Sequence, residues 1–135
     1  MKILICGDVM GKAGRRAIER DLPKIRQQLG LDFVIVNGEN AAHGFGITDK
    51  ICKSIYAAGA DVITTGNHVW DQREITNYID LDNKLLRPMN YPEGTPGNGV
   101  GVFSTPSGQK VMVLNPMGRL FMDPLDDPFA SVDNA

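Results

Sequence analysis

Blocks of apolar residues alternate with amphipathic segments along the first half of this chain. Apolar runs occupy residues 2–6, 33–36 and 61–65, and runs of this length are typical of strands buried on both faces of a parallel sheet. After the first two runs, apolar residues recur at helical spacing over residues 17–29 and 51–56. The pattern predicts an α/β fold in which parallel strands have flanking helices.

Capping residues and one proline set the expected boundaries of these two helices. Gly30 is expected to end the first helix, and Thr48 is expected to cap a second helix that runs over 49–58. Pro23 lies inside the first helical pattern and disfavours helical geometry in the residues before it. It therefore predicts either a kink or two short helices.

A further helix is expected after the third strand. Asp71 and Glu74 have the spacing of an acidic capping pair, which predicts a helix that reaches about Ile79. Alternatively, Asp71 orients the imidazole ring of His68, which lies three residues earlier.

The pattern changes from residue 85 onward. Residues 87–99 are rich in proline and glycine and predict a loop with little regular structure. Two short apolar runs, 100–104 and 110–114, flank turn residues at 106–108 and predict a hairpin. The sheet should therefore gain a mixed or antiparallel portion. No closing element is evident near Ala135.

Each of the three predicted parallel strands ends in glycine followed by groups that can bind a metal ion. Because the carboxyl ends of parallel strands face one crevice, these groups should converge there. They are Asp8, Glu39, Asn40, Asn67 and His68. His43, in the loop after Asn40, is a candidate for contact with substrate, and the alternative is a solvated loop histidine.

The chemistry of these side chains indicates a metal centre. Carboxylate and amide oxygens suit Mn, Mg or Fe, and imidazole suits Fe, Mn or Zn. A carboxylate shared by two such ions is typical of phosphoester hydrolysis, in which the ions clamp the phosphoryl oxygens. The alternative interpretation is that these residues only cap strands and form turns.

A dinucleotide-binding Rossmann-like domain is a further alternative, based on the glycines after the first strand. Gly7 and Gly11 do not have the spacing of a phosphate-binding loop, and no G-x-G-x-x-G motif is present. A strand-to-helix turn explains them more simply.

Composition limits the remaining possibilities. A chain of 135 residues with 42% apolar and 22% charged residues is expected to form a single domain, 1–135. Its net charge of -2 provides no basic field for nucleic acid. Two cysteines form no disulfide framework, and no signal peptide or membrane span is evident, so we expect a cytoplasmic protein.

Segments 7–11, 37–42 and 65–71 closely resemble motifs of the calcineurin-like metallophosphoesterase superfamily, and in particular of its bacterial YmdB-type branch. Residues 117–119 and 124–129 match that branch too. The resemblance implies a phosphodiesterase that acts on 2′,3′-cyclic nucleotides or RNA-like phosphodiesters. It also implies two divalent metal ions, Fe or Mn with Mg or Zn as alternatives, and we expect a homo-oligomer.

The resemblance also implies a role for each candidate residue. Asp8 and Asn40 would bind one metal, Asn67 would bind the other, and Glu39 would bridge the two. His68 would be the general acid that protonates the leaving oxygen.

The chain departs from the family pattern in one respect. That pattern continues beyond this length and supplies three more histidine ligands, whereas this chain has only two histidines in all. We therefore expect the first half of a metallophosphoesterase sandwich, a fold incomplete at Ala135, and weak or no activity from this chain alone. A C-terminal half would complete the site. The alternative is a catalytically inactive or regulatory binding module that keeps the fold.

Overall fold

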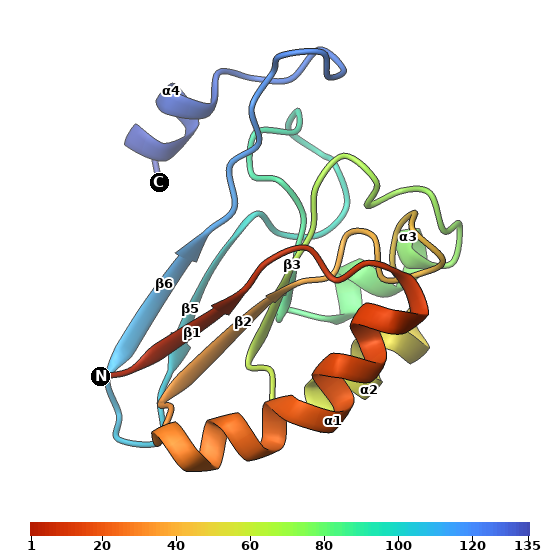
Figure 1. Cartoon of the computed structure of the whole chain (residues 1–135). Coiled ribbons are helices and arrows are strands. Elements are labelled where there is room, and N and C mark those ends of the chain that lie inside the picture. The colour runs from red at the N-terminus through yellow and green to blue at the C-terminus, as the bar shows by residue number, and fades with distance from the viewer.

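A parallel sheet and a separate hairpin form the framework of the computed structural model, which describes residues 1–135 (Figure 1). The sheet has four strands in the order β1 (Ile3–Cys6), β2 (Phe33–Asn37), β3 (Val62–Thr64) and β4 (Leu85–Leu86), all parallel. The hairpin consists of β5 (Val100–Ser104) and β6 (Lys110–Leu114), which pair antiparallel. The predicted parallel strands and the antiparallel pairing of the hairpin are thus confirmed. The prediction that the hairpin adds a mixed or antiparallel portion to the parallel sheet is wrong, because β5 and β6 form a separate two-stranded sheet. The pattern does not predict β4, because two residues are too few to show a period.

Helices follow the first three strands. They are α1 (Gly11–Leu29), α2 (Asp49–Ala57) and α3 (Ile75–Tyr78), the last of which continues into the 3₁₀ helix η1 (Ile79–Leu81). Gly30 ends α1 in the left-handed conformation, and the Thr48 hydroxyl caps α2 by accepting a hydrogen bond from the Ile51 N–H. Both capping predictions are confirmed. No helix combines the length and the apolar character that crossing a membrane would require.

One helix prediction is wrong, and one of the two alternatives for α1 is excluded. α1 continues through Pro23 and is not divided into two short helices, while the kink stays a prediction. Pro23 and Glu19 are both exposed, so water can reach the Glu19 carbonyl that the proline leaves without a helical partner. The helix expected to start at Asp71 begins only at Ile75, because the Asp71 carboxylate bonds to the His68 ring instead of capping.

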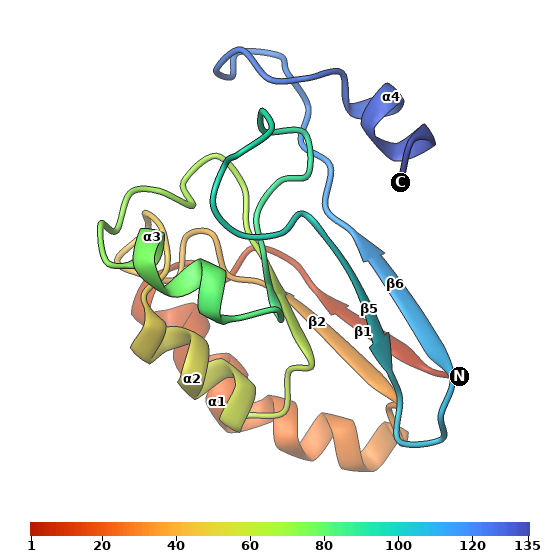
Figure 2. The ribbon, with the colours of Figure 1, turned by 180° about the vertical axis from the view of Figure 1, so that it is seen from behind.

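Different layers cover the two faces of the parallel sheet (Figures 1 and 2). Val34 and Val36 point to the face on which α1 and α2 lie, and they share one core cluster with Leu22 and Ile55. Phe33 points to the opposite face, where it belongs to a smaller cluster with residues of β3, β4 and β6. This alternation is the ordinary consequence of a period of two along a strand.

The hairpin leaves the edge strand β1 partly uncovered. Ile3 pairs in register with Phe33, and Ile5 pairs with Ile35, so all four lie on the hairpin side of the sheet. Phe33 and Ile35 belong to the cluster beneath the hairpin, whereas Ile3 is 41% exposed and Ile5 is 71% exposed. The outer surface of β1 is therefore apolar and open.

The last segment of the chain, residues 116–135, runs away from both sheets, and we call it the C-terminal arm (Figure 2). Asn90, only 1% exposed, holds the arm in place. Its Nδ2 donates to the carbonyl oxygens of Met117 and Asp126 at 2.8 and 3.0 Å, and its Oδ1 accepts from the Met117 N–H at 2.9 Å. One buried amide thus fixes two points of the arm.

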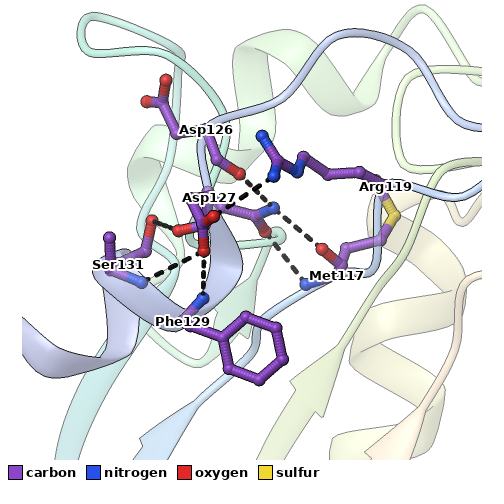
Figure 3. Close-up of polar contacts among 8 residues, drawn as sticks. Met117, Arg119, Asp126, Asp127, Phe129 and Ser131 are labelled. Atoms are coloured by element: carbon purple, nitrogen blue, oxygen red, sulfur yellow. Dashed lines mark hydrogen bonds and ion pairs between the residues drawn. The ribbon is translucent and has the colours of Figure 1, made fainter.

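The arm ends in a short helix, α4 (Pro128–Asp133), although no closing element was evident in the sequence. The Asp127 carboxylate caps it by accepting from the N–H groups of Phe129 and Ala130 at 2.9 and 3.3 Å. Arg119 reaches the same carboxylate at 3.2 Å, while the Phe129 ring points away from these polar groups (Figure 3). An aspartate followed by a proline at the first helical position is a signal for a helix start.

Candidate functional site

The turns that follow β1, β2 and β3 are neighbours at one edge of the sheet. The Val9 N–H donates to the Asn37 carbonyl at 3.0 Å, and the Gly38 N–H donates to the Thr64 carbonyl at 2.9 Å. These bonds extend the parallel pairing past the ends of the strands. The residues after each strand are therefore presented side by side.

Asp8 and Asn40 are brought into direct contact, although they are 32 positions apart. The Asn40 Nδ2 donates to Asp8 Oδ2 at 2.9 Å, and the Asn40 carbonyl accepts from the Gly11 N–H at 2.9 Å. The other amide atom, Asn40 Oδ1, is buried and has no hydrogen-bond partner. A buried carbonyl oxygen without a partner carries a desolvation cost of about 1–3 kcal/mol, and a bound cation would offset it.

Glu39 occupies the space that the missing side chain of Gly66 leaves free. A Cβ at Gly66 would lie 2.0 Å from Glu39 Oε2 and 2.6 Å from its Cδ. On its other side, Asn37 accepts from the Glu39 N–H at 3.1 Å and donates weakly to Glu39 Oε1 at 3.4 Å. The carboxylate is therefore held between the turns after β2 and β3.

Glu39 and Asn67 open into the same cleft, which has a volume of about 380 Å³. Ends of β2, β3 and β6 and the start of the C-terminal arm line it: Asn37, Glu39, Thr65, Gly66, Asn67, Asn115, Pro116, Met117, Gly118, Leu120 and Met122. Asn115 joins these elements, because its Nδ2 donates to the carbonyl oxygens of Thr65 and Leu86 at 2.9 and 3.1 Å. The arm thus forms one wall of the cleft.

Asn37 and Asn115 are residues of the site that sequence reasoning missed. Asn37 is the last residue of β2, and Asn115 directly follows β6. The signal that identified Asp8 and Asn67, a polar group at the end of an apolar strand, would have found both. The sequence did not specify where the hairpin lies in the fold, so the end of β6 gave no reason to look there.

His68 is held by two neighbours. Its Nδ1 lies 2.7 Å from Asp71 Oδ2, which confirms the alternative that Asp71 orients the imidazole. The Phe45 ring packs against it edge to face, with centroids 5.2 Å apart. With Nδ1 engaged, Nε2 is the nitrogen left for other chemistry.

His43 lies apart from this cleft. It lines a second hollow of about 460 Å³ with residues of α1, α2 and the turn after β3: Arg15, Glu19, Ala42, Thr48, Lys50, Ile51, Ser54, Gln72 and Glu74. Its φ of 57° is left-handed, so the backbone is strained there. The structure therefore does not bring His43 together with Glu39 and Asn67, and its contact with substrate stays a prediction.

The donor set of the candidate site consists mainly of oxygen atoms. His, Cys, Asp and Glu side chains do not gather anywhere in groups of three or more that could hold a metal. The amides of Asn40 and Asn67 would therefore have to join the carboxylates of Asp8 and Glu39 as metal ligands. Two carboxylates and two amides favour hard divalent cations.

Comparison with known proteins gives a consistent result. The model of the family described as YmdB-like protein matches residues 4–135. A protein of Bacillus subtilis (strain 168) named 2′,3′-cyclic-nucleotide 2′-phosphodiesterase is 48% identical over 98% of this chain and 50% of its own length.

Solved structures agree with this relationship. A hypothetical protein from Thermus thermophilus superposes with a TM-score of 0.92 at 42% identity, over 99% of this chain and 52% of that one. A structure described as a novel phosphatase from Mycoplasma pneumoniae has a TM-score of 0.90 at 31% identity, over 99% and 50% of the two chains. The chain thus spans about half the length of the relatives it matches. By sequence and by fold, it belongs to the family of YmdB-like proteins.

Proposed function

We propose that this chain provides one side of the active site of a metal-dependent phosphodiesterase with a calcineurin-like fold. The substrate would be a 2′,3′-cyclic nucleotide or an RNA-like phosphodiester. The proposal rests chiefly on the pair Asp8–Asn40, in which the amide oxygen is buried without a partner next to a carboxylate. Names of the similar proteins, a phosphodiesterase and a phosphatase, support the reaction class.

The residues present fit a pair of divalent ions. Asp8 and Asn40 would hold one ion, Asn67 would hold the other, and Glu39, which the space at Gly66 admits, would contact both. Fe or Mn would suit this set, with Mg or Zn as alternatives. When bound, such ions neutralise phosphoryl charge and lower the pKa of a water molecule.

The protein groups have separate tasks in the hydrolysis. Water attacks phosphorus and releases a proton to solvent, and the bond from phosphorus to a ribose oxygen breaks. His68 gives this oxygen a proton and takes one back from solvent after the product leaves. Asp71, bonded to Nδ1 at 2.7 Å, fixes the ring so that Nε2 is the donating atom. Asn37 steadies Glu39 by accepting a hydrogen bond from its backbone N–H.

Further ligands would come from a segment that corresponds to the other half of the relatives. Open apolar surface supports this part of the proposal, because Ile5 is 71% exposed on β1 and Val102 is 63% exposed on β5. A second layer packed on these strands would complete a sandwich. The 135-residue chain alone would then be weakly active or inactive.

Mutation of the carboxylates tests the proposal. In a form of the protein that matches its relatives in length, Asp8→Ala and Glu39→Ala should abolish Mn²⁺-dependent hydrolysis of adenosine 2′,3′-cyclic phosphate. Glu93→Ala removes an exposed carboxylate from the loop before β5 and is the matched control. Wild-type rates in both site variants would show that the site is wrongly assigned.

A binding module that keeps the fold without catalysis is the second candidate. The small number of histidines favours it. The chain has two histidines, and of these only His68 lies in a turn that borders the cleft. Elemental analysis separates the two candidates. The phosphodiesterase should retain transition metal after purification or after incubation with Mn²⁺, whereas the binding module should contain none.

A further inference from the structure

An exposed aromatic ring stands beside the proposed general acid. Phe45 is 58% exposed, and its ring contacts His68 edge to face at a centroid separation of 5.2 Å with an interplanar angle of 79°. Most of the phenyl surface is therefore open to solvent. Covering this apolar surface with a ligand would be favourable, by about 25 cal/mol for each Å² removed from water.

The loop that carries Phe45 is tied to both halves of the candidate site. Gln72 Nε2 donates to the Phe45 carbonyl at 2.7 Å, and the Gly44 N–H donates to the Asn40 carbonyl at 3.1 Å. A Cβ at Gly46 would lie only 3.0 Å from the His68 carbonyl oxygen, so the loop packs tightly on the turn after β3. Phe45 is thus presented at a fixed position between Asn40 and His68.

Two exposed apolar side chains, those of Phe45 and Met10, lie at this loop. Met10, 54% exposed, is the other large apolar side chain close to the loop, with its sulfur 3.5 Å from the Cβ position of Gly44. His68, a residue of the candidate site, contacts the Phe45 ring. A stable protein interface needs roughly 800 Å² from each partner, whereas one phenyl ring matches the face of one nucleobase.

We propose that Phe45 is the stacking platform for the base of the nucleotide substrate whose scissile phosphodiester lies at His68. This inference rests on the proposed function and adds that base recognition comes from the loop after Asn40. Stacking tolerates every base, because each has a π-face. The enzyme should therefore prefer substrates that carry a base without strong preference among bases.

Two substrates that differ only in the base provide the test. In a form of the protein that matches its relatives in length, Phe45→Ala should lower kcat/KM for adenosine 2′,3′-cyclic phosphate by about 5- to 150-fold, mainly through KM, which is the range for losing one stacked base. The same variant should change kcat/KM for methyl riboside 2′,3′-cyclic phosphate, which has no base, by less than about twofold. Phe45→Trp should retain the adenosine rate.

Phe129→Ala is the matched control, because Phe129 is also an exposed phenylalanine, 81% exposed, but lies on α4 of the arm. It should leave both rates unchanged. Equal losses on both substrates in Phe45→Ala, or no loss on the adenosine substrate, would overturn the proposal.

A binding measurement separates failure of the platform from failure of the proposed function. If the wild type hydrolysed neither substrate, the phosphodiesterase assignment would be rejected. Calorimetry with adenosine 3′-monophosphate would then test the stacking role of Phe45 independently of catalysis. Binding by the wild type that is about 5- to 150-fold tighter than by Phe45→Ala supports it. Equal binding, or no binding to either form, overturns it.

Discussion

Gly66→Ala tests the placement of Glu39 more sharply than removal of the carboxylate itself, because it changes position and leaves the chemistry in place. The added methyl group would lie 2.0 Å from Oε2 and 2.8 Å from Oε1 of Glu39. Real Cβ atoms essentially never come closer than 3.0 Å to another heavy atom. The carboxylate must therefore leave the pocket between the turns after β2 and β3.

The magnitude follows from the size of this displacement. To reach an ordinary contact of 3.4 Å, Oε2 must move by roughly 1.4 Å. A shift of about 1 Å in a reacting group costs on the order of 10²-fold in rate. The fold should survive, because the φ of Gly66 is not left-handed and a half-buried carboxylate can rotate. The free energy of unfolding should fall by about 1 kcal/mol, the low end for overpacking.

The assay combines three measurements on a form of the protein that matches its relatives in length. Hydrolysis of adenosine 2′,3′-cyclic phosphate at saturating Mn²⁺ gives kcat, titration calorimetry gives Mn²⁺ affinity, and urea unfolding gives stability. Gly7→Ala is the matched control, since Gly7 also lies between a strand and a site residue, but its Cβ would meet nothing within 4 Å. We expect the control to stay within about twofold of wild type.

Two results would refute this reasoning. A folded Gly66→Ala protein with wild-type kcat and Mn²⁺ affinity would show that the position of Glu39 is irrelevant to the site. A similar loss in Gly7→Ala would show that any methyl group at a strand end is harmful, and the effect would then say nothing about Glu39.

Three further predictions concern the proposed general acid, the arm and the core. His68→Ala should lower the hydrolysis rate of adenosine 2′,3′-cyclic phosphate by about 10²–10⁴-fold but that of a nitrophenyl phosphodiester much less, since nitrophenolate leaves without a proton; equal losses would remove the general-acid role. Asn90→Ala deletes three side-chain hydrogen bonds to the arm and should lower the free energy of unfolding, measured in urea, by about 2–4 kcal/mol. A loss no larger than that of the exposed control Asn77→Ala would show that Asn90 does not hold the arm in place. Cys52 is 0% exposed and burial raises the pKa of its thiol, so iodoacetamide at pH 8 should alkylate it only after unfolding, and mass spectrometry of the native protein would reveal any earlier labelling.

The parallel sheet and the edge at which the turns after its strands meet could be predicted because the signals are local. Phe33 and Val34 face opposite layers, and a strand buried on both faces must be apolar throughout. Helix ends were predictable at Gly30 and Thr48 for the same reason, since each cap satisfies groups within its own helix. Where residues close together in the sequence determine the geometry, sequence patterns are enough to predict it.

Contacts between distant segments could not be predicted. Asp71 had two possible partners, its own helix or the His68 ring, and only the turn after β3 decided between them. Asn115 belongs to the site because β6 ends beside Thr65 and Leu86. A hairpin sequence indicates that two strands pair, but it does not indicate the sheet against which they pack.

The most direct test of the central claim is an anomalous diffraction measurement. Crystals of a form that matches the relatives in length, grown with Mn²⁺, would give difference peaks at the positions of bound metal. We predict two peaks, one beside Asp8 and Asn40 and one beside Asn67, with the Glu39 carboxylate between them. Peaks elsewhere, or none at a Mn²⁺ concentration that supports hydrolysis, would contradict the two-metal site.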